Sequence, residues 1–192
     1  MIYDDASLAE GLARDLDASF EHLVLAYQDR LFGFALRLSG RAADAEDSVQ
    51  DAFVRAYRAL RRYPEAQRRS LQVRPWLYRI TLNVVRNRAR GRPTQALDGA
   101  ITDRLTAARA EQPEPVAEAA ERRRELAHLL RTLPERYRAP VVLRHVQGLP
   151  YAEIAAILDQ PVGTTKANVH RGLNLLRNSL ENQPELVGGA FA

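Results

Sequence analysis

The 192-residue sequence contains no cysteine, and Lys166 is its single lysine. The missing thiols exclude a disulfide framework, a thiolate zinc site and a thiol redox sensor within this chain. Long apolar runs are missing too, since no stretch approaches the roughly 20 apolar residues that cross a bilayer. The N-terminal residues form neither a basic nor an apolar segment, so we see no secretory signal and expect a cytoplasmic location.

Patterns typical of enzymes are also missing. There is no Gly-rich phosphate loop, which excludes an ATPase of that type. No Ser/His/Asp set or carboxylate pair stands out, and the four histidines show no metal-ligand spacing; these are His22, His128, His145 and His170. We therefore expect no enzyme, no cofactor and no metal.

Charge is distributed unevenly along the chain. Residues 1–51 hold eleven acidic side chains against four arginines, whereas residues 52–92 hold twelve arginines against one acid, Glu65. Such asymmetry suggests a polyanionic partner for the basic segment, although a solvated basic face would give the same composition.

Apolar spacing of three and four residues predicts amphipathic helices. The first two cover residues 20–38 and 42–60, and Pro64 ends the second. A polar, arginine-rich loop follows over residues 61–75. Pro75 then suits the first turn of a third helix, which Gly91 and Pro93 close.

Periodicity fades over residues 92–116, which read as a flexible linker, and it returns at residues 117–133. A further helix starts near residue 135, and residues 183–192 form a tail. No strand-like alternation is visible. The sequence thus predicts an all-α chain of two small helical domains joined by a linker.

The stretch LPYAEIAAILDQPVGTTKANVHRGLNLLR (149–177) resembles an interrupted helix. Starting a helix-turn-helix at Tyr151 puts Ala155 where two helices cross closely. Asp159 opens the turn, because Asp tolerates a left-handed backbone. Pro161 prevents continuation, and Gly163 with Thr164 supplies the N-cap of the next helix.

The second helix of this motif would be two-faced. Its inward face would consist of Val162, Thr165, Val169, Leu173 and Leu176. Its outward face would consist of Lys166, Ala167, Asn168, His170 and Arg171. The outward donors suit phosphates and base edges in a major groove. A plain helical hairpin would show the same spacing, and the polar cluster is what favours DNA.

Three motifs in order carry a family resemblance: AEDSVQDAFVRAYRAL (45–60), RPWLYRITLNVVRNRAR (74–90) and LPERYRAPVVLRHVQGLPYAEIAAILDQPVGTTKANVHRG (133–172). Together they resemble the extracytoplasmic-function sigma factors of bacterial RNA polymerase, which keep only conserved regions two and four. The resemblance implies an N-terminal extension (1–19), region two (20–91), a linker (92–116), region four (117–182) and a tail (183–192).

The resemblance also implies three sets of site residues. Core polymerase would contact Asp47, Gln50, Asp51, Phe53 and Arg55, with Phe53 also packing inward. The melted minus-ten element would contact Arg68, Arg69, Arg74, Trp76, Tyr78, Arg79, Asn83, Arg86 and Asn87, although a Trp that begins an apolar stripe, as Trp76 does, is usually part of the core. Cations that follow the backbone and aromatics that support unstacked bases are what single strands require.

The minus-thirty-five element would contact Thr164, Thr165, Lys166, Asn168, His170 and Arg171. Here the chain departs from the family, which commonly reads GTVKSR where this sequence has GTTKAN. Gly is usual at Asp159 and Asp is common at Asn87. Because Asn168 could read adenine where Arg would read guanine or phosphate, the promoter sequence does not transfer.

The expected function is that of an alternative, stress- or signal-responsive sigma factor. Its partners would be core RNA polymerase, promoter DNA and, as is common in the family, an anti-sigma protein, with no membrane insertion. Two other classes compete. A stand-alone helix-turn-helix regulator explains residues 149–177 but not the acidic helix and arginine-rich loop, and an enzyme has no supporting motif.

Overall fold

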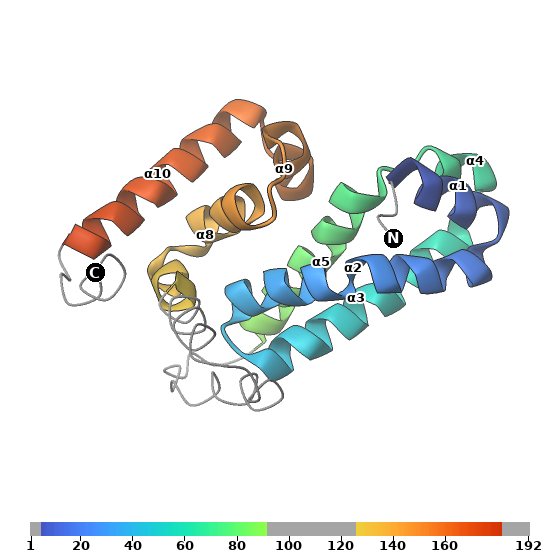
Figure 1. Cartoon of the computed structure of the whole chain (residues 1–192), viewed down its shortest axis with the longest axis horizontal. Coiled ribbons are helices and arrows are strands. Elements are labelled where there is room, and N and C mark those ends of the chain that lie inside the picture. Colours follow the sequence, from blue (N-terminus) through green and yellow to red (C-terminus); the bar gives the residue numbers. More distant parts are fainter. Residues whose placement is uncertain (1–4, 92–125, 182–192) are drawn as a thin grey trace, which may run out of the picture.

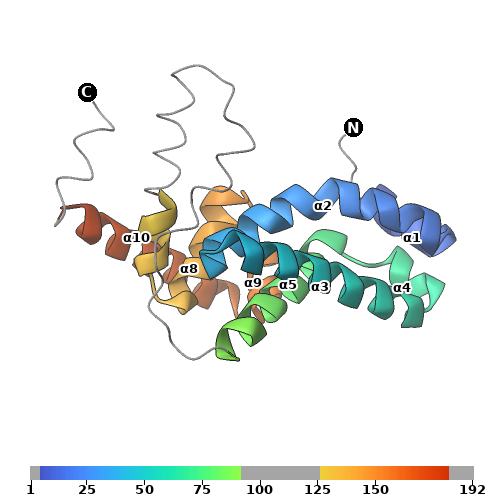
Figure 2. The same cartoon turned by 90° about the horizontal axis from the view of Figure 1, so that it is seen from below.

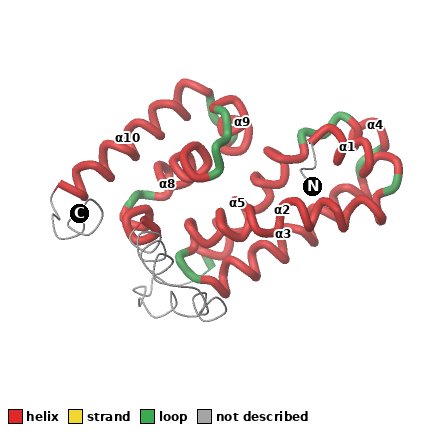
Figure 3. Tube along the Cα trace, viewed as in Figure 1, coloured by secondary structure: helices red, strands yellow, loops and turns green. Residues whose placement is uncertain are grey.

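The computed structural model describes residues 5–91 and 126–181, and within these ranges every regular element is helical (Figure 3). The first domain contains α1 (Asp5–Arg14), α2 (Leu16–Ser39), α3 (Ala42–Arg62), α4 (Glu65–Arg69) and α5 (Val73–Arg90). The second contains α8 (Glu135–Val141), the π-helical turn η1 (Val142–Val146), α9 (Tyr151–Leu158) and α10 (Val162–Glu181). The all-α prediction is confirmed.

Helices α2, α3 and α5 form the body of the first domain, and α1 and α4 lie side by side at one of its ends (Figures 1 and 2). Its centre is made of fully buried side chains such as Leu31, Phe34 and Leu60. The rings of Phe34 and Tyr78 meet edge to face, with centroids 5.2 Å apart. This packing fixes α5 against α2.

Helix α1 lies within the stretch for which we expected an acidic extension, residues 1–19. Its side chains Leu8, Leu12 and Ala13 are buried, and α2 begins at Leu16 rather than at residue 20. Asp15 caps α2 by accepting a hydrogen bond from the backbone N–H of Ala18. The described part of this stretch is therefore a helix of the domain core.

The expected loop over residues 61–75 also contains a helix. Pro64 is the N-cap residue of α4, and its carbonyl oxygen accepts from the N–H groups of Gln67 and Arg68. None of the five residues of α4 is buried, which is why no apolar periodicity marked it.

The interrupted helix has the predicted turn. Helix α9 begins at Tyr151, and Asp159 ends it with φ 52° and ψ 54°, a left-handed conformation. In the described ranges Asp159 is the one residue other than glycine with a positive φ. The Asp at this position therefore takes the backbone conformation that was expected of it.

Two details of the next helix differ from the prediction. Helix α10 already begins at Val162, so Gly163 and Thr164 lie in its first turn and do not cap it. Val162 itself is 40% exposed instead of facing inward, because it precedes the first residue that reaches the core, Thr165. The inward row is completed by Gly172, against which Val141 and Tyr137 of α8 pack.

The two domains contact each other. Helix α9 lies along α5, and α8 with η1 touches α2 (Figure 1). Arg138 of α8 is half-buried there; it donates to the carbonyl oxygen of Leu38 at 2.9 Å and to those of Arg131 and Leu133. Burial lowers the pKa of Arg138. These carbonyls lie at or near helix C-termini, where a cation is favoured.

The predicted linker (92–116) and tail (183–192) lie outside the described residues. The predicted helix over residues 117–133 is described only from residue 126, where residues 126–132 are helical.

Candidate polymerase and nucleic-acid interfaces

The outer face of α3 carries the residues expected to contact core polymerase. Asp47 and Gln50 are exposed, and Asp51 is half-buried beside Arg55, whose Nε and Nη2 each donate to it at 3.0 Å. Phe53 is only 8% exposed, and its ring meets that of Phe20 edge to face. The structure thus presents polar groups outward and turns Phe53 inward, as the two-faced prediction requires.

Asp47 is tied to the end of α5. Arg88 donates to the Oδ2 atom of Asp47 at 3.0 Å and also to its backbone carbonyl. This exposed ion pair joins α3 to α5, and exposed pairs of this kind are weak. A partner could therefore displace Arg88 from Asp47 at little cost.

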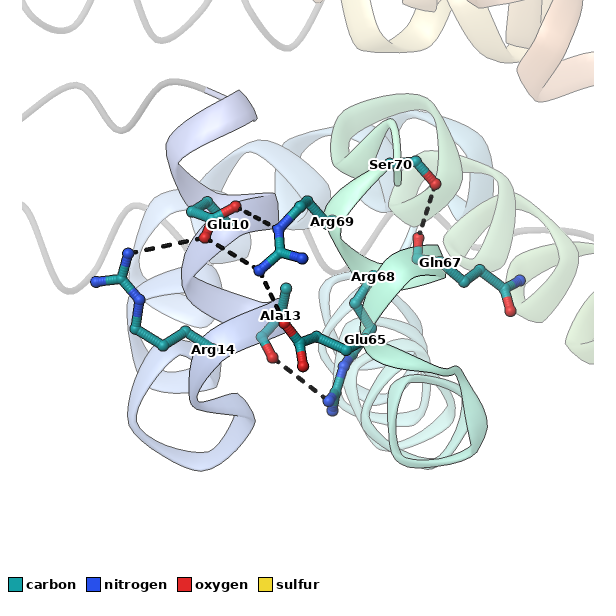
Figure 4. A network of polar contacts seen from close by, with 8 residues as sticks. All are labelled: Glu10, Ala13, Arg14, Glu65, Gln67, Arg68, Arg69 and Ser70. Carbon is teal, nitrogen blue, oxygen red and sulfur yellow. Dashed lines mark hydrogen bonds and ion pairs between the residues drawn. The ribbon is translucent and has the colours of Figure 1, made fainter.

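The two arginines of α4 point toward α1 (Figure 4). Arg69 donates to Glu10 at 2.8 Å and to Glu65 at 2.8 Å, and Arg68 reaches the carbonyl oxygen of Ala13 at 3.5 Å. The hydrogen bond from Arg69 lowers the pKa of Glu10. Part of the positive charge of the basic segment is thus neutralised by acids of the first 51 residues.

Three arginines of α5, Arg74, Arg79 and Arg86, point toward the second domain. Arg74 binds both carboxylate oxygens of Glu153 on α9, at 2.8 and 2.5 Å. Arg79 donates to the carbonyl oxygen of Ala156, and Arg86 donates to Glu135 at 2.7 Å. The hydrogen bonds that Arg74 donates to Glu153 raise the pKa of Arg74. Three of the minus-ten candidates therefore hold the two domains together.

Tyr78 is only 1% exposed and donates to the Oε1 atom of Gln147 at 2.7 Å. Burial raises the pKa of Tyr78 to about 12. In this arrangement its ring belongs to the core and is not available to an unstacked base, which differs from the expectation. Trp76 is half-buried, packs against the core and lies 6.3 Å from the ring of Tyr63.

The remaining minus-ten candidates are exposed. Asn83 and Asn87 face solvent, and the Oδ1 atom of Asn87 accepts from Arg90 at 3.3 Å. The minus-ten candidates on α5 therefore divide into two groups: Arg74, Arg79 and Arg86 contact α8 and α9, whereas Asn83 and Asn87 are exposed to solvent.

The outer face of α10 carries the minus-thirty-five candidates. Thr164, Lys166, His170 and Arg171 are exposed, and Asn168 is half-buried with its Nδ2 atom 3.4 Å from the Oε1 atom of Gln160. Thr165 is fully buried; it accepts from Gln160 and donates to the carbonyl oxygen of Pro161. Its assignment to the DNA-facing set is corrected, whereas its inward-facing prediction is confirmed.

Sequence reasoning missed the groups that bind the predicted minus-ten residues: Glu10 binds Arg69, Glu135 binds Arg86, Gln147 binds Tyr78 and Glu153 binds Arg74. One signal was available, because Leu8, Ala9, Leu12 and Ala13 follow helical spacing and predict α1. The three residues from the second domain gave none, since the contacts between domains have no local pattern.

Residues 5–91 and 126–181 contain neither a candidate metal-binding cluster nor a helix that could span a membrane. No cluster of three or more His, Asp or Glu side chains there could hold a metal ion. None of the helices described combines the length and apolar character needed to span a bilayer.

Comparison with known proteins identifies both domains. The family model for Sigma-70 region 2 matches residues 23–93, and that for Sigma-70 region 4 matches residues 123–176. The ECF RNA polymerase sigma factor SigE of Mycolicibacterium smegmatis is 35% identical over 164 residues, which are 84% of this chain and 62% of SigE. The ECF RNA polymerase sigma factor SigW of Bacillus subtilis is 34% identical over 176 residues, 88% of this chain and 91% of SigW.

A solved structure shares the arrangement. CnrH, in complex with the cytosolic domain of CnrY, has a TM-score of 0.68 and 28% identity, and the match covers 93% of this chain and 97% of CnrH. Both domains thus match in sequence and the whole chain matches in fold. The chain belongs to the extracytoplasmic-function family of RNA polymerase sigma factors.

Proposed function

We propose that this chain binds core RNA polymerase through α3 and directs it to promoters through α5 and α10. The supporting observation is that domains matching regions two and four carry separate exposed polar faces, one on α3 and one on α10. Polymerase and promoter DNA of bacteria are cytoplasmic, so we place its action there.

The α3 surface would act by polar contact. Asp47 and Gln50 stand free of the core, and the buried Phe53 holds the helix in place from within. Because removing the polar groups of Asp47, Gln50 and Asp51 leaves the apolar core intact, their loss should weaken binding without unfolding the domain.

The first experiment is co-elution of the chain with purified core polymerase. We expect a stoichiometric complex for the wild type and a binding loss of at least tenfold for Asp47→Ala/Gln50→Ala/Asp51→Ala. A matched control, Glu21→Ala/Gln28→Ala/Asp29→Ala on α2, changes the same kinds of exposed residue and should bind normally. A folded wild type that binds promoter DNA alone and no polymerase would instead indicate a stand-alone regulator.

In DNA recognition, α10 would enter the major groove of the minus-thirty-five duplex with Lys166, His170 and Arg171 toward the DNA. The arginines of α4 and α5 would follow the melted minus-ten strand. Arg74, Arg79 and Arg86 now contact α9 and α8 of the second domain, so both helices have to leave α5 before these three side chains can reach DNA.

Contacts between the domains also suggest how the chain could be controlled. A protein that favours the closed arrangement would keep the α5 arginines from DNA, and an anti-sigma partner fits this role. The related CnrH was solved with the cytosolic domain of CnrY.

A further inference from the structure

The N-terminal end of α5 has no cap from its own neighbours in the sequence. The side chain of its N-cap residue, Gln72, makes no capping hydrogen bond, and the first turn holds no acidic residue. Pro75 has no N–H group, and the N–H of Trp76 already donates to the carbonyl oxygen of Gln72. The backbone N–H of Arg74 is thus a donor of the first turn that needs an acceptor from outside the helix.

Asp5, the first residue of α1, supplies that acceptor. Both of its carboxylate oxygens lie 3.1 Å from the backbone nitrogen of Arg74, which is 69 residues away in the sequence. A carboxylate at a helix N-terminus accepts from the free N–H groups and is favoured by the positive end of the helix dipole. Asp5 therefore acts on α5 as an N-cap does, although it belongs to another helix.

A tyrosine of α2 fixes the carboxylate in this position. Tyr27 is only 4% exposed, and its O–H donates to the Oδ1 atom of Asp5 at 2.7 Å. Burial and this hydrogen bond raise the pKa of Tyr27, so its hydroxyl stays protonated and continues to donate. Asp5 thereby joins α1, α2 and the start of α5 at a single point.

This cap does not depend on the second domain. Asp5, Tyr27 and the backbone of Arg74 all lie in the first domain, whereas the side chain of Arg74 binds Glu153 of α9. When α8 and α9 leave α5, Arg74 loses its bonds to Glu153 but keeps the bond from its N–H to Asp5. The first turn of α5 then stays in place while the guanidinium group becomes free to bind another acceptor.

We infer that Asp5 is a positioning residue for the minus-ten contact: its carboxylate caps α5 and holds Arg74 where the guanidinium group meets the unpaired strand. This inference rests on the proposed function and adds to it a residue of α1 that acts without touching DNA. Without the cap, the first turn of α5 would fray. The guanidinium group would then occupy many positions, and ordering it on the strand would weaken binding.

The test uses holoenzyme assembled from core polymerase and the full chain. Its probe is a single-stranded oligonucleotide with the minus-ten segment of a promoter that wild-type holoenzyme selects from random duplex DNA. The variants are Asp5→Ala, Asp5→Asn, Arg74→Ala and the double variant Asp5→Ala/Arg74→Ala. The affinity of each variant for core polymerase is also measured, because α3 lies in the same domain and its binding reports whether that domain is folded.

We expect Asp5→Ala to bind core normally and to bind the oligonucleotide about fivefold more weakly, the ratio that loss of an N-cap bond typically gives. Asp5→Asn should stay within about twofold of the wild type, because Oδ1 alone accepts from both Tyr27 and Arg74 and asparagine retains this atom. In the Arg74→Ala background, Asp5→Ala should cause little further loss, since a residue that acts through the Arg74 side chain has no effect without it.

Several outcomes would overturn the inference while leaving the proposed function intact. One is normal oligonucleotide binding by Asp5→Ala or by Arg74→Ala. Another is an equal loss of core binding in Asp5→Ala, since Asp5 would then support the whole first domain and not α5 in particular. A third is simple addition of the two losses in the double variant, and a fourth is a loss in Asp5→Asn as large as that in Asp5→Ala. If wild-type holoenzyme selects no promoter, the proposed function fails and this inference fails with it.

Discussion

At the scale of single residues, Gly172 shows how one side chain sets the packing of the DNA-reading helix. A Cβ atom at this position would lie 2.6 Å from the Cγ2 atom of Val141 and 3.3 Å from the Cβ atom of Tyr137. Val141 is buried, so shifting its side chain would disturb packed neighbours. The absence of a side chain is therefore what lets α10 lie close against α8.

Replacing Gly172 by Ala should lower stability, although Ala usually stabilises a helix relative to Gly. Ala is favoured over Gly in a helix by about 1 kcal/mol, but overpacking a core costs about 1–3 kcal/mol. We expect Gly172→Ala to destabilise the second domain by up to about 2 kcal/mol, which is the overpacking cost less the helix gain, measured by thermal unfolding. In the same helix Gly163 has nothing within 4 Å, so Gly163→Ala should be neutral or slightly stabilising. Equal effects of the two changes would contradict this account.

At the scale of the element, α1 decides whether the N-terminal stretch belongs to the domain. Leu12 is fully buried, and α1 touches α2, α4 and α5. The ion pair of Glu10 with Arg69 joins its outer side to α4 (Figure 4). The burial of its apolar face supplies most of this attachment, since exposed pairs contribute little.

Removing a buried side chain from α1 should therefore destabilise the whole first domain. We expect Leu12→Ala to cost about 2–4 kcal/mol, read from urea unfolding followed by the fluorescence of Trp76. Leu25→Ala on α2 is the control, because Leu25 is exposed and should change stability by no more than about 0.5 kcal/mol. If Leu12→Ala had so small an effect, α1 would be an accessory segment.

At the scale of the molecule, the two domains meet through side chains that the sequence resemblance assigns to the minus-ten element. Arg74 binds Glu153, Tyr78 binds Gln147, and Arg86 binds Glu135. The pair of Arg74 with Glu153 makes two hydrogen bonds and is partly buried, so it should contribute more to the closed arrangement than a fully exposed pair does.

We expect Glu153→Gln to shift the free chain toward separated domains. The chain has no cysteine, so cysteines introduced at Gln28 and Asn178 can carry a fluorophore pair that reports the distance between domains. Energy transfer should fall in Glu153→Gln and stay unchanged in Glu21→Gln, a control on the exposed face of α2. Unchanged transfer in both would mean that other contacts hold the domains closed.

Much of this fold follows from local patterns. The helices α2, α3, α5, α9 and α10 were predicted from apolar spacing, with ends that differ by a few residues. The turn at Asp159 was predicted because few residues adopt its left-handed backbone. Helix α4 was missed because none of its residues is buried.

The chemical character of the site residues was likewise visible in the sequence. Whether their side chains are exposed to a binding partner was not. Residue type and spacing placed Lys166 and Arg171 on the outer face of α10, where the structure has them. Tyr78 and Thr165 were named as DNA contacts, and both are buried. A sequence pattern predicts which face of a helix a side chain occupies. Only the tertiary structure determines which other elements pack on that face.

The sequence by itself determined the helices, their amphipathic faces and the break in the helix-turn-helix, because each depends on neighbours within a few residues. Tertiary structure alone decided which arginines are free. Arg69 and Arg74 find carboxylates 59 and 79 residues away, whereas the cluster of Arg58, Arg61 and Arg62 finds none in the described chain. Pairing across such separations depends on how the helices pack, and the packing of the two domains is what brings Glu153 to Arg74.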